Sequence, residues 1–110
     1  MKAAKKKRLT AGGWIVGDAK RFLGLTDEEA AFIGLKLALT DSLKRRRLEL
    51  GLTQTQLAKR LESSQSRVAK MEAGDRTVSL DLLVRSLFAV GMTQRELGKV
   101  ITAAARRSAA

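Results

Sequence analysis

Signals for helix starts recur along this 110-residue chain, and they constrain its fold more than any other feature. Threonine followed three residues later by Glu or Gln occurs at Thr26–Glu29, Thr53–Gln56 and Thr93–Glu96. In each pair, the two side chains can accept hydrogen bonds from free backbone N–H groups at the first turn of a helix. Ser64 and Ser79 are suited to cap two further helices. The chain is therefore predicted to form several helices that begin at these positions.

Glycines supply the matching stop signals. Gly51, Gly74 and Gly91 each follow a helical pattern of apolar residues, where glycine can take the left-handed conformation that ends a helix. The chain has no proline, and no segment shows the clean apolar–polar alternation of a strand. The predicted helices cover about residues 16–23, 27–50, 54–61, 65–73, 80–90 and 94–105. The predicted fold class is all-α.

The chain is strongly basic, with 22 Lys and Arg against 11 Asp and Glu and a formal net charge of +11. This excess predicts a polyanionic partner, either nucleic acid or an anionic membrane surface. A membrane is the less favoured partner, because no apolar run approaches the roughly 18–20 residues that span a bilayer. The basic residues are also not confined to one face of an apolar helix. No secretory signal is recognised, so we expect a cytoplasmic, nucleoid-associated protein.

Cysteine, histidine and tyrosine are absent. Disulfides and thiolate chemistry are thereby excluded, and neither a metal site nor a cofactor is predicted. General acid–base or nucleophilic catalysis has few candidate residues, because no acidic cluster converges either. We therefore do not expect an enzyme.

The stretch at residues 54–73 reads QTQLAKRLESSQSRVAKMEA. Its two predicted helices turn a set of apolar residues inward: Leu57, Ala58, Leu61, Val68 and Met71. A three-residue turn, Glu62-Ser63-Ser64, separates the helices. Two short helices joined in this way form a helix-turn-helix, whose second helix enters the major groove of DNA.

The outer face of the second helix is polar and carries no carboxylate. At 100° per residue, Ser66 and Lys70 point away from the core, and Gln65 and Arg67 flank them near the helix start. Gln can pair with adenine and Lys with guanine, so we predict that these four residues contact bases. The alternative is an ordinary solvated face.

Two charged residues are expected to be buried. Arg47 shares a helix face with Leu43 and Leu50, and Glu72 lies toward the inner face of the second helix. Because each charge would be costly to bury alone, the two are predicted to form an ion pair. The pair would fix the recognition helix to the scaffold, as a structural site.

The segment Leu43–Ala58, together with Met71, Glu72 and Gly74, resembles the phage-repressor-like helix-turn-helix family, the Cro-type or xenobiotic-response-element family, over about residues 40–91. The resemblance implies a compact five-helix DNA-binding domain that binds operator DNA as a homodimer. Here the domain would have a long first helix and a short N-terminal extension.

The resemblance also implies roles for single residues. Gln54 would hold a phosphate, often while touching Gln65, and Gln65, Ser66 and Lys70 would face bases. The Arg47–Glu72 pair is a family feature as well. One departure is Glu62, which stands where glycine is usual, so a non-glycine residue is expected in the left-handed region.

Four parts of the chain are predicted. Residues 1–12 form a basic flexible arm, 13–26 an extension packed on the domain, 27–105 the DNA-binding domain and 106–110 a flexible tail. The arm would strengthen DNA binding or reach into a minor groove, unless it is a tail without a fixed role. Thr53, Arg76 and Ser79 are expected to contact phosphate beside the recognition helix.

Several apolar residues are candidates for a dimer or partner surface: Trp14, Phe22, Leu97, Val100 and Ile101. Trp14 and Phe22 fit an ordinary core as well, and Phe88 and Met92 are expected in the core. The stripe on the last helix suits a symmetric dimer, which would place two recognition helices about one DNA turn apart.

Two functions are therefore open. The first is a transcriptional repressor. The second is an antitoxin that binds a small ribonuclease toxin and represses its own operon, because residues 14–26 resemble the N-terminal extension of some repressor-like regulators and of HigA-like antitoxins.

Overall fold

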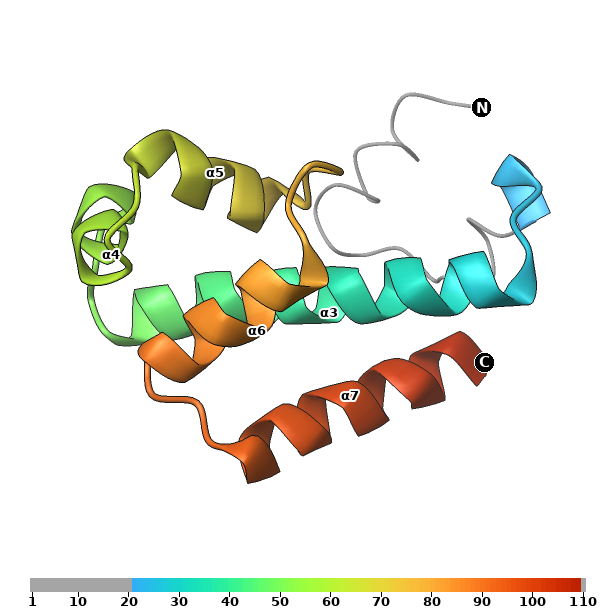
Figure 1. The fold of residues 1–110 in the computed structure, drawn as a ribbon. Helices are drawn as coiled ribbons and strands as arrows, with labels where there is room; N and C mark the ends of the chain where they lie inside the picture. Colours follow the sequence, from blue (N-terminus) through green and yellow to red (C-terminus); the bar gives the residue numbers. More distant parts are fainter. Residues whose placement is uncertain (1–20, 110) are drawn as a thin grey trace.

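A computed structural model describes residues 21–109 of the chain (Figure 1). In this part the helices are α3 (Asp27–Glu49), α4 (Gln54–Arg60), α5 (Gln65–Ala73), α6 (Leu80–Ala89) and α7 (Gln94–Ala109). The all-α prediction is confirmed, and no strand occurs among the described residues. The basic arm, Trp14 and most of the predicted helix at 16–23 lie outside them.

The predicted helix starts are confirmed. At each Thr capping box, the threonine Oγ1 accepts from a backbone N–H at 3.1 Å and the Glu or Gln side chain accepts from the threonine N–H at 2.8 Å. Ser64 Oγ accepts from the Arg67 N–H at 3.1 Å, and Ser79 Oγ accepts from the Leu82 N–H at 3.0 Å. These bonds satisfy N–H groups that have no partner within the helix.

Two positions carry the left-handed backbone on which the helix-turn-helix depends. Gly74 ends α5 at φ 71°, as predicted. Glu62, in the turn between α4 and α5, has φ 55° and is the non-glycine residue with positive φ in the described part of the chain. The turn stabilises this strained backbone conformation, because the Ser63 N–H donates to the Ala58 carbonyl at 2.8 Å.

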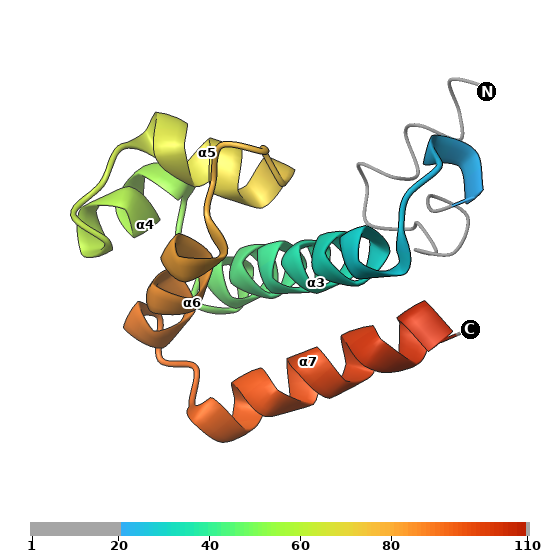
Figure 2. The same ribbon diagram turned by 45° about the vertical axis from the view of Figure 1, so that its right-hand side comes forward.

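Helix α3 is the scaffold of the fold. Helix α7 runs antiparallel along one side of α3, whereas α4 and α5 lie on its other side and α6 crosses near its C-terminal half (Figures 1 and 2). The largest fully buried side chains come from α3, α4, α5 and α6: Leu39, Leu43, Leu57, Val68, Met71, Leu83 and Leu87. A single core therefore holds the helix-turn-helix on α3.

Several predicted core and surface positions need correction. Phe88 was expected in the core but is 42% exposed, and Leu50 is 39% exposed because α3 ends one residue before it. Leu97 and Val100 pack partly against the core, so of the α7 stripe Ile101 is the exposed member. Helix α7 also continues to Ala109, past the predicted end at Ala105, because its alanine-rich end carries no stop signal.

No helix in the described residues is both long and apolar enough to cross a bilayer.

Candidate nucleic-acid interface

The predicted recognition helix is α5, which has one buried apolar face and one exposed polar face. Val68 and Met71 are fully buried, whereas Gln65, Ser66 and Lys70 are exposed. The single carboxylate of α5 belongs to Glu72, whose side chain is only 4% exposed. The exposed face of α5 is therefore polar and free of negative charge, as a surface that approaches DNA must be.

Arg47 and Glu72 form a bidentate ion pair between α3 and α5. Arg47 Nε lies 2.6 Å from Glu72 Oε2, and Arg47 Nη2 donates to Glu72 Oε1 at 3.0 Å. The remaining Arg47 nitrogen, Nη1, donates to the Leu52 carbonyl at 2.8 Å, just before α4. The hydrogen bond to Glu72 is the main cause that raises the pKa of Arg47, and the charge of Glu72 adds to it. One arginine thus joins the scaffold to both helices of the motif.

Gln54 extends this network to the start of α5. Its Nε2 donates to Glu72 Oε1 at 3.2 Å, and its Oε1 accepts from Gln65 Nε2 at 2.7 Å. Gln54 and Gln65 are therefore in contact, as the family resemblance implied. The sequence did not indicate that Glu72 also bonds Gln54, because residues 18 apart on different helices show no periodic relation.

The segment after α5 is a loop held by several hydrogen bonds. Asp75 Oδ1 accepts from the Thr77 N–H at 2.8 Å and from its hydroxyl at 2.6 Å. Lys36 Nζ donates to the Arg76 carbonyl at 3.4 Å, which ties the loop to α3. Asp75 was not among the predicted site residues, although the Asp-x-Thr pattern is a recognisable turn signal.

The predicted phosphate-binding residues lie at helix starts and in this loop. Thr53 Oγ1 and Ser79 Oγ accept capping bonds, and each hydroxyl still has its own proton to donate. Arg76 and Thr77 are exposed. Gln54 is half-buried at the first turn of α4, close to the start of α5.

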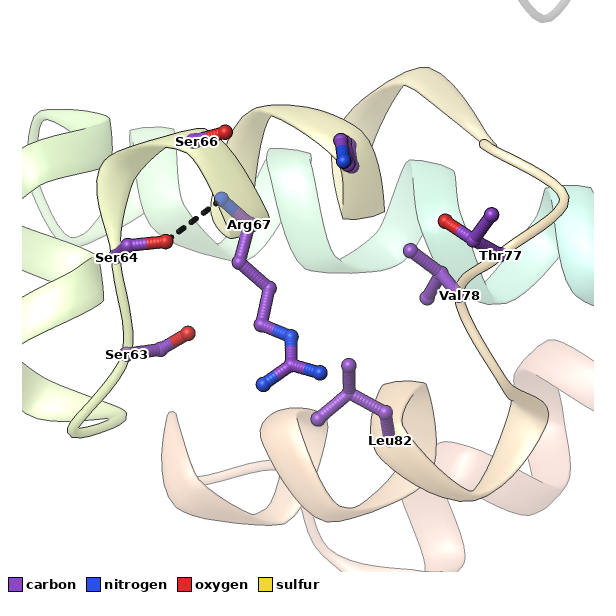
Figure 3. Close-up of a pocket in the computed structure, with 8 residues that line it drawn as sticks. Ser63, Ser64, Ser66, Arg67, Thr77, Val78 and Leu82 are labelled. Atoms are coloured by element: carbon purple, nitrogen blue, oxygen red, sulfur yellow. Dashed lines mark hydrogen bonds between the residues drawn. The ribbon is translucent and has the colours of Figure 1, made fainter.

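A groove of about 530 Å³ runs beside α5 (Figure 3). Its lining contains no carboxylate and consists of Ser63, Ser64, Ser66, Arg67, Lys70, Thr77, Val78 and Leu82. Figure 3 shows Arg67 extending toward Leu82 of α6, while Ser66 lies on the other side of α5. Arg67 therefore lines this groove together with Ser66 and Lys70, and its side chain extends toward α6.

The Asp75 turn predicts a pH response of the loop. The pKa of Asp75 is lowered by the hydrogen bonds from Thr77, first the hydroxyl and then the backbone, and further by the charges of Lys70 and Lys36. A carboxylate with a lowered pKa holds these bonds above its unfolded pKa and releases them as pH falls through the folded pKa. The Thr77 amide resonance should therefore titrate below the ordinary aspartate range.

The matched control is Asp75→Asn, which keeps an acceptor oxygen but has no proton to gain. Its Thr77 amide should show no titration in this range. A Thr77 midpoint at or above that of a free aspartate would contradict the assignment.

The motif is also detected by comparison with known families. A family model described as helix-turn-helix matches residues 43–85, which include all of α4 and α5. No curated protein and no solved structure matches the chain significantly. Residues 43–85 therefore match the helix-turn-helix family found in Cro- and CI-type repressors and HigA-like antitoxins, a match that supports sequence-specific DNA binding and transcription regulation.

Proposed function

We propose that the protein is a transcriptional repressor that reads operator DNA with α5 in the major groove. The observation that carries the proposal is the exposed, carboxylate-free face of α5, held to the scaffold by the Arg47–Glu72 pair. Gln65, Ser66 and Lys70 would contact base edges, because they are exposed along this face. Such a protein would be associated with the nucleoid.

The phosphate contacts would surround this helix. Gln54 and Thr53 would bind the backbone on one side, and Arg76 and Ser79 on the other. We assign Arg67 to the phosphate backbone as well, because its side chain extends into the groove between α5 and α6 (Figure 3).

Selection from a random duplex library tests the function. The protein should enrich one sequence motif at moderate salt, and the purified protein should shift a duplex carrying that motif. If no motif is enriched while the helical circular dichroism is intact, the proposed sequence reading is wrong.

The repressor would act as a dimer, and the exposure of the apolar residues supports one contact surface over the others. On α7, Leu97 and Val100 pack against the core and are not free for a dimer contact. Phe88, near the end of α6, is 42% exposed. Because α6 and α5 line the same groove, a two-fold axis near Phe88 would keep the two α5 helices close together. We therefore place the dimer contact there.

Phe88→Ser should convert the dimer to a monomer in light scattering and weaken binding to a two-half-site operator. Phe32→Ser is the matched control, since Phe32 is 50% exposed at the other end of the fold. A Phe88→Ser protein that stays dimeric would refute this contact.

The antitoxin remains the second candidate, because exposed aromatic and apolar residues also lie away from α5. Phe22 is 49%, Phe32 50% and Ile101 42% exposed, on or beside the N-terminal half of α3 and on α7. Such residues would suit a protein partner. Co-expression with the neighbouring gene tests this: a small ribonuclease that co-purifies with the wild type and not with Phe32→Ser would support it.

A further inference from the structure

Helix α7 carries a second basic surface, which is separate from the recognition helix α5 and has no role in the proposed DNA contacts of α5. Arg95, Lys99 and Arg106 recur at helical spacing and are exposed. Together with Gly98, Thr102 and Ala103 they line an open cavity of about 410 Å³. We call these six residues the α7 basic face. It lies opposite the face of α7 that packs on the core through Leu97 and Val100.

One acid, Glu96, lies within electrostatic reach of Lys99 on this face, and its carboxylate accepts a hydrogen bond from the Thr93 N–H. On α3 and α6, exposed arginines pair with an acid one turn away, Arg45 with Asp41 and Arg85 with Asp81. No such ion pair occurs at Arg95, Lys99 or Arg106 among the described residues. From residue 97 to residue 110 the sequence has no Asp or Glu. The α7 basic face therefore differs from the paired arginines of α3 and α6, and no acid follows Glu96 along the helix.

The position of the α7 basic face separates it from the reading helix. In both views α7 lies across α3 from α4 and α5 (Figures 1 and 2), so its outer face points away from α5. A short straight duplex bound to α5 could not also reach this face, because DNA is stiff over lengths of about 150 base pairs.

We propose that the α7 basic face binds the phosphodiester backbone of a second duplex DNA segment, so that the protein bridges two segments. At a rise of 1.5 Å per residue, Arg95 and Lys99 are about 6 Å apart along the axis of α7, and Arg95 and Arg106 are about 16 Å apart. The three cations therefore form a row that could contact successive phosphates of one DNA strand. The other lining residues, Gly98, Thr102 and Ala103, have no long side chain, which lets the DNA backbone approach. A second copy of α7 is a poor occupant, because its like charges would face these cations.

The test uses the full chain and random-sequence duplexes of about 20 base pairs, too short to bend around the protein. One duplex is fixed to beads, and a second, labelled duplex is offered in solution. The variant Arg95→Gln/Lys99→Gln/Arg106→Gln is compared with Lys44→Gln/Arg45→Gln/Arg85→Gln, which removes the same charge from exposed positions elsewhere. Circular dichroism melts verify that both variants fold.

The wild type and the control variant should capture the second duplex, whereas the α7 variant should lose capture about tenfold or more. Binding of a single duplex should change much less, because α5 remains intact. The dependence of capture on salt should become shallower by about 2–3 in log–log slope, as expected for three lost phosphate contacts.

Three results would overturn the proposal. The first is unchanged capture by the α7 variant, which would assign bridging to two α5 helices of a dimer. The second is no capture by the wild type. The third is displacement of the labelled duplex by polyglutamate as effectively as by unlabelled duplex at equal charge, which would indicate an acidic protein as the occupant. If α5 bound DNA without sequence preference, the proposed repressor function would fail but random duplexes would still be captured. Failure of the proposed function and failure of the bridging proposal therefore give different results.

Discussion

Arg47→Ala should lower the free energy of unfolding by about 3–5 kcal/mol, measured by urea denaturation at neutral pH. In the described part of the chain, the substitution leaves the Glu72 carboxylate, whose side chain is 4% exposed, with the Gln54 amide as its remaining side-chain hydrogen-bond partner. It also removes the bond to the Leu52 carbonyl. Small domains are stable by only about 5–15 kcal/mol, so a measurable fraction of the variant should be unfolded without denaturant.

A double substitution separates stability from function. Arg47→Met/Glu72→Leu removes both charges together, and its stability should recover to near the wild-type value because no charge is left buried alone. Its DNA affinity should stay reduced, since Gln54 no longer has Glu72 to hold it. Arg45→Ala is the surface control, because its pair with Asp41 is exposed and worth little. If the midpoint of Arg47→Ala equals that of Arg45→Ala, the pair does not stabilise the fold.

Lys70→Ala should relax the base preference of the protein and weaken binding to its selected motif by about 1–3 kcal/mol. Lys70 is exposed on α5 and lines the groove beside this helix. Loss of a base contact removes discrimination at one position of the motif, so affinity for mismatched duplexes should fall far less. Competition binding with duplexes that vary one base pair at a time measures this difference.

Arg76→Ala is the matched control for Lys70→Ala. Arg76 is exposed in the loop that Asp75 and Lys36 hold, and we assign it to phosphate. Its loss should weaken binding to all sequences alike and make the salt dependence shallower by about one. If Lys70→Ala weakens binding to all sequences alike, as Arg76→Ala should, then Lys70 binds the DNA backbone and does not contribute to base discrimination by α5.

Local signals were sufficient for the helix starts and for the end of α5. Each Thr capping box and each N-cap serine begins a helix where predicted, and Gly74 ends α5. These features depend on residues only a few positions apart, whose hydrogen bonds form within one turn. The left-handed Glu62 was expected from the family resemblance, because Glu62 stands where glycine is usual.

The amphipathic pattern also indicated which face of α5 is buried. The wheel placed Val68 and Met71 inward and Lys70 outward, and it brought Arg47 and Glu72 toward the same core. A periodic pattern gives the direction in which a side chain leaves its own helix, but it carries no information on which neighbour the side chain meets.

The sequence by itself therefore determined the helices, the motif and the polar face of α5, since each depends on local capping and periodicity. Only the tertiary structure decided that Leu97 and Val100 pack on the core while Phe88 is exposed, and that Arg67 extends toward α6. It also decided that Gln54 joins Gln65 to Glu72. These outcomes depend on how α3, α5, α6 and α7 pack against one another, and packing between distant segments is set by the shape of the whole core.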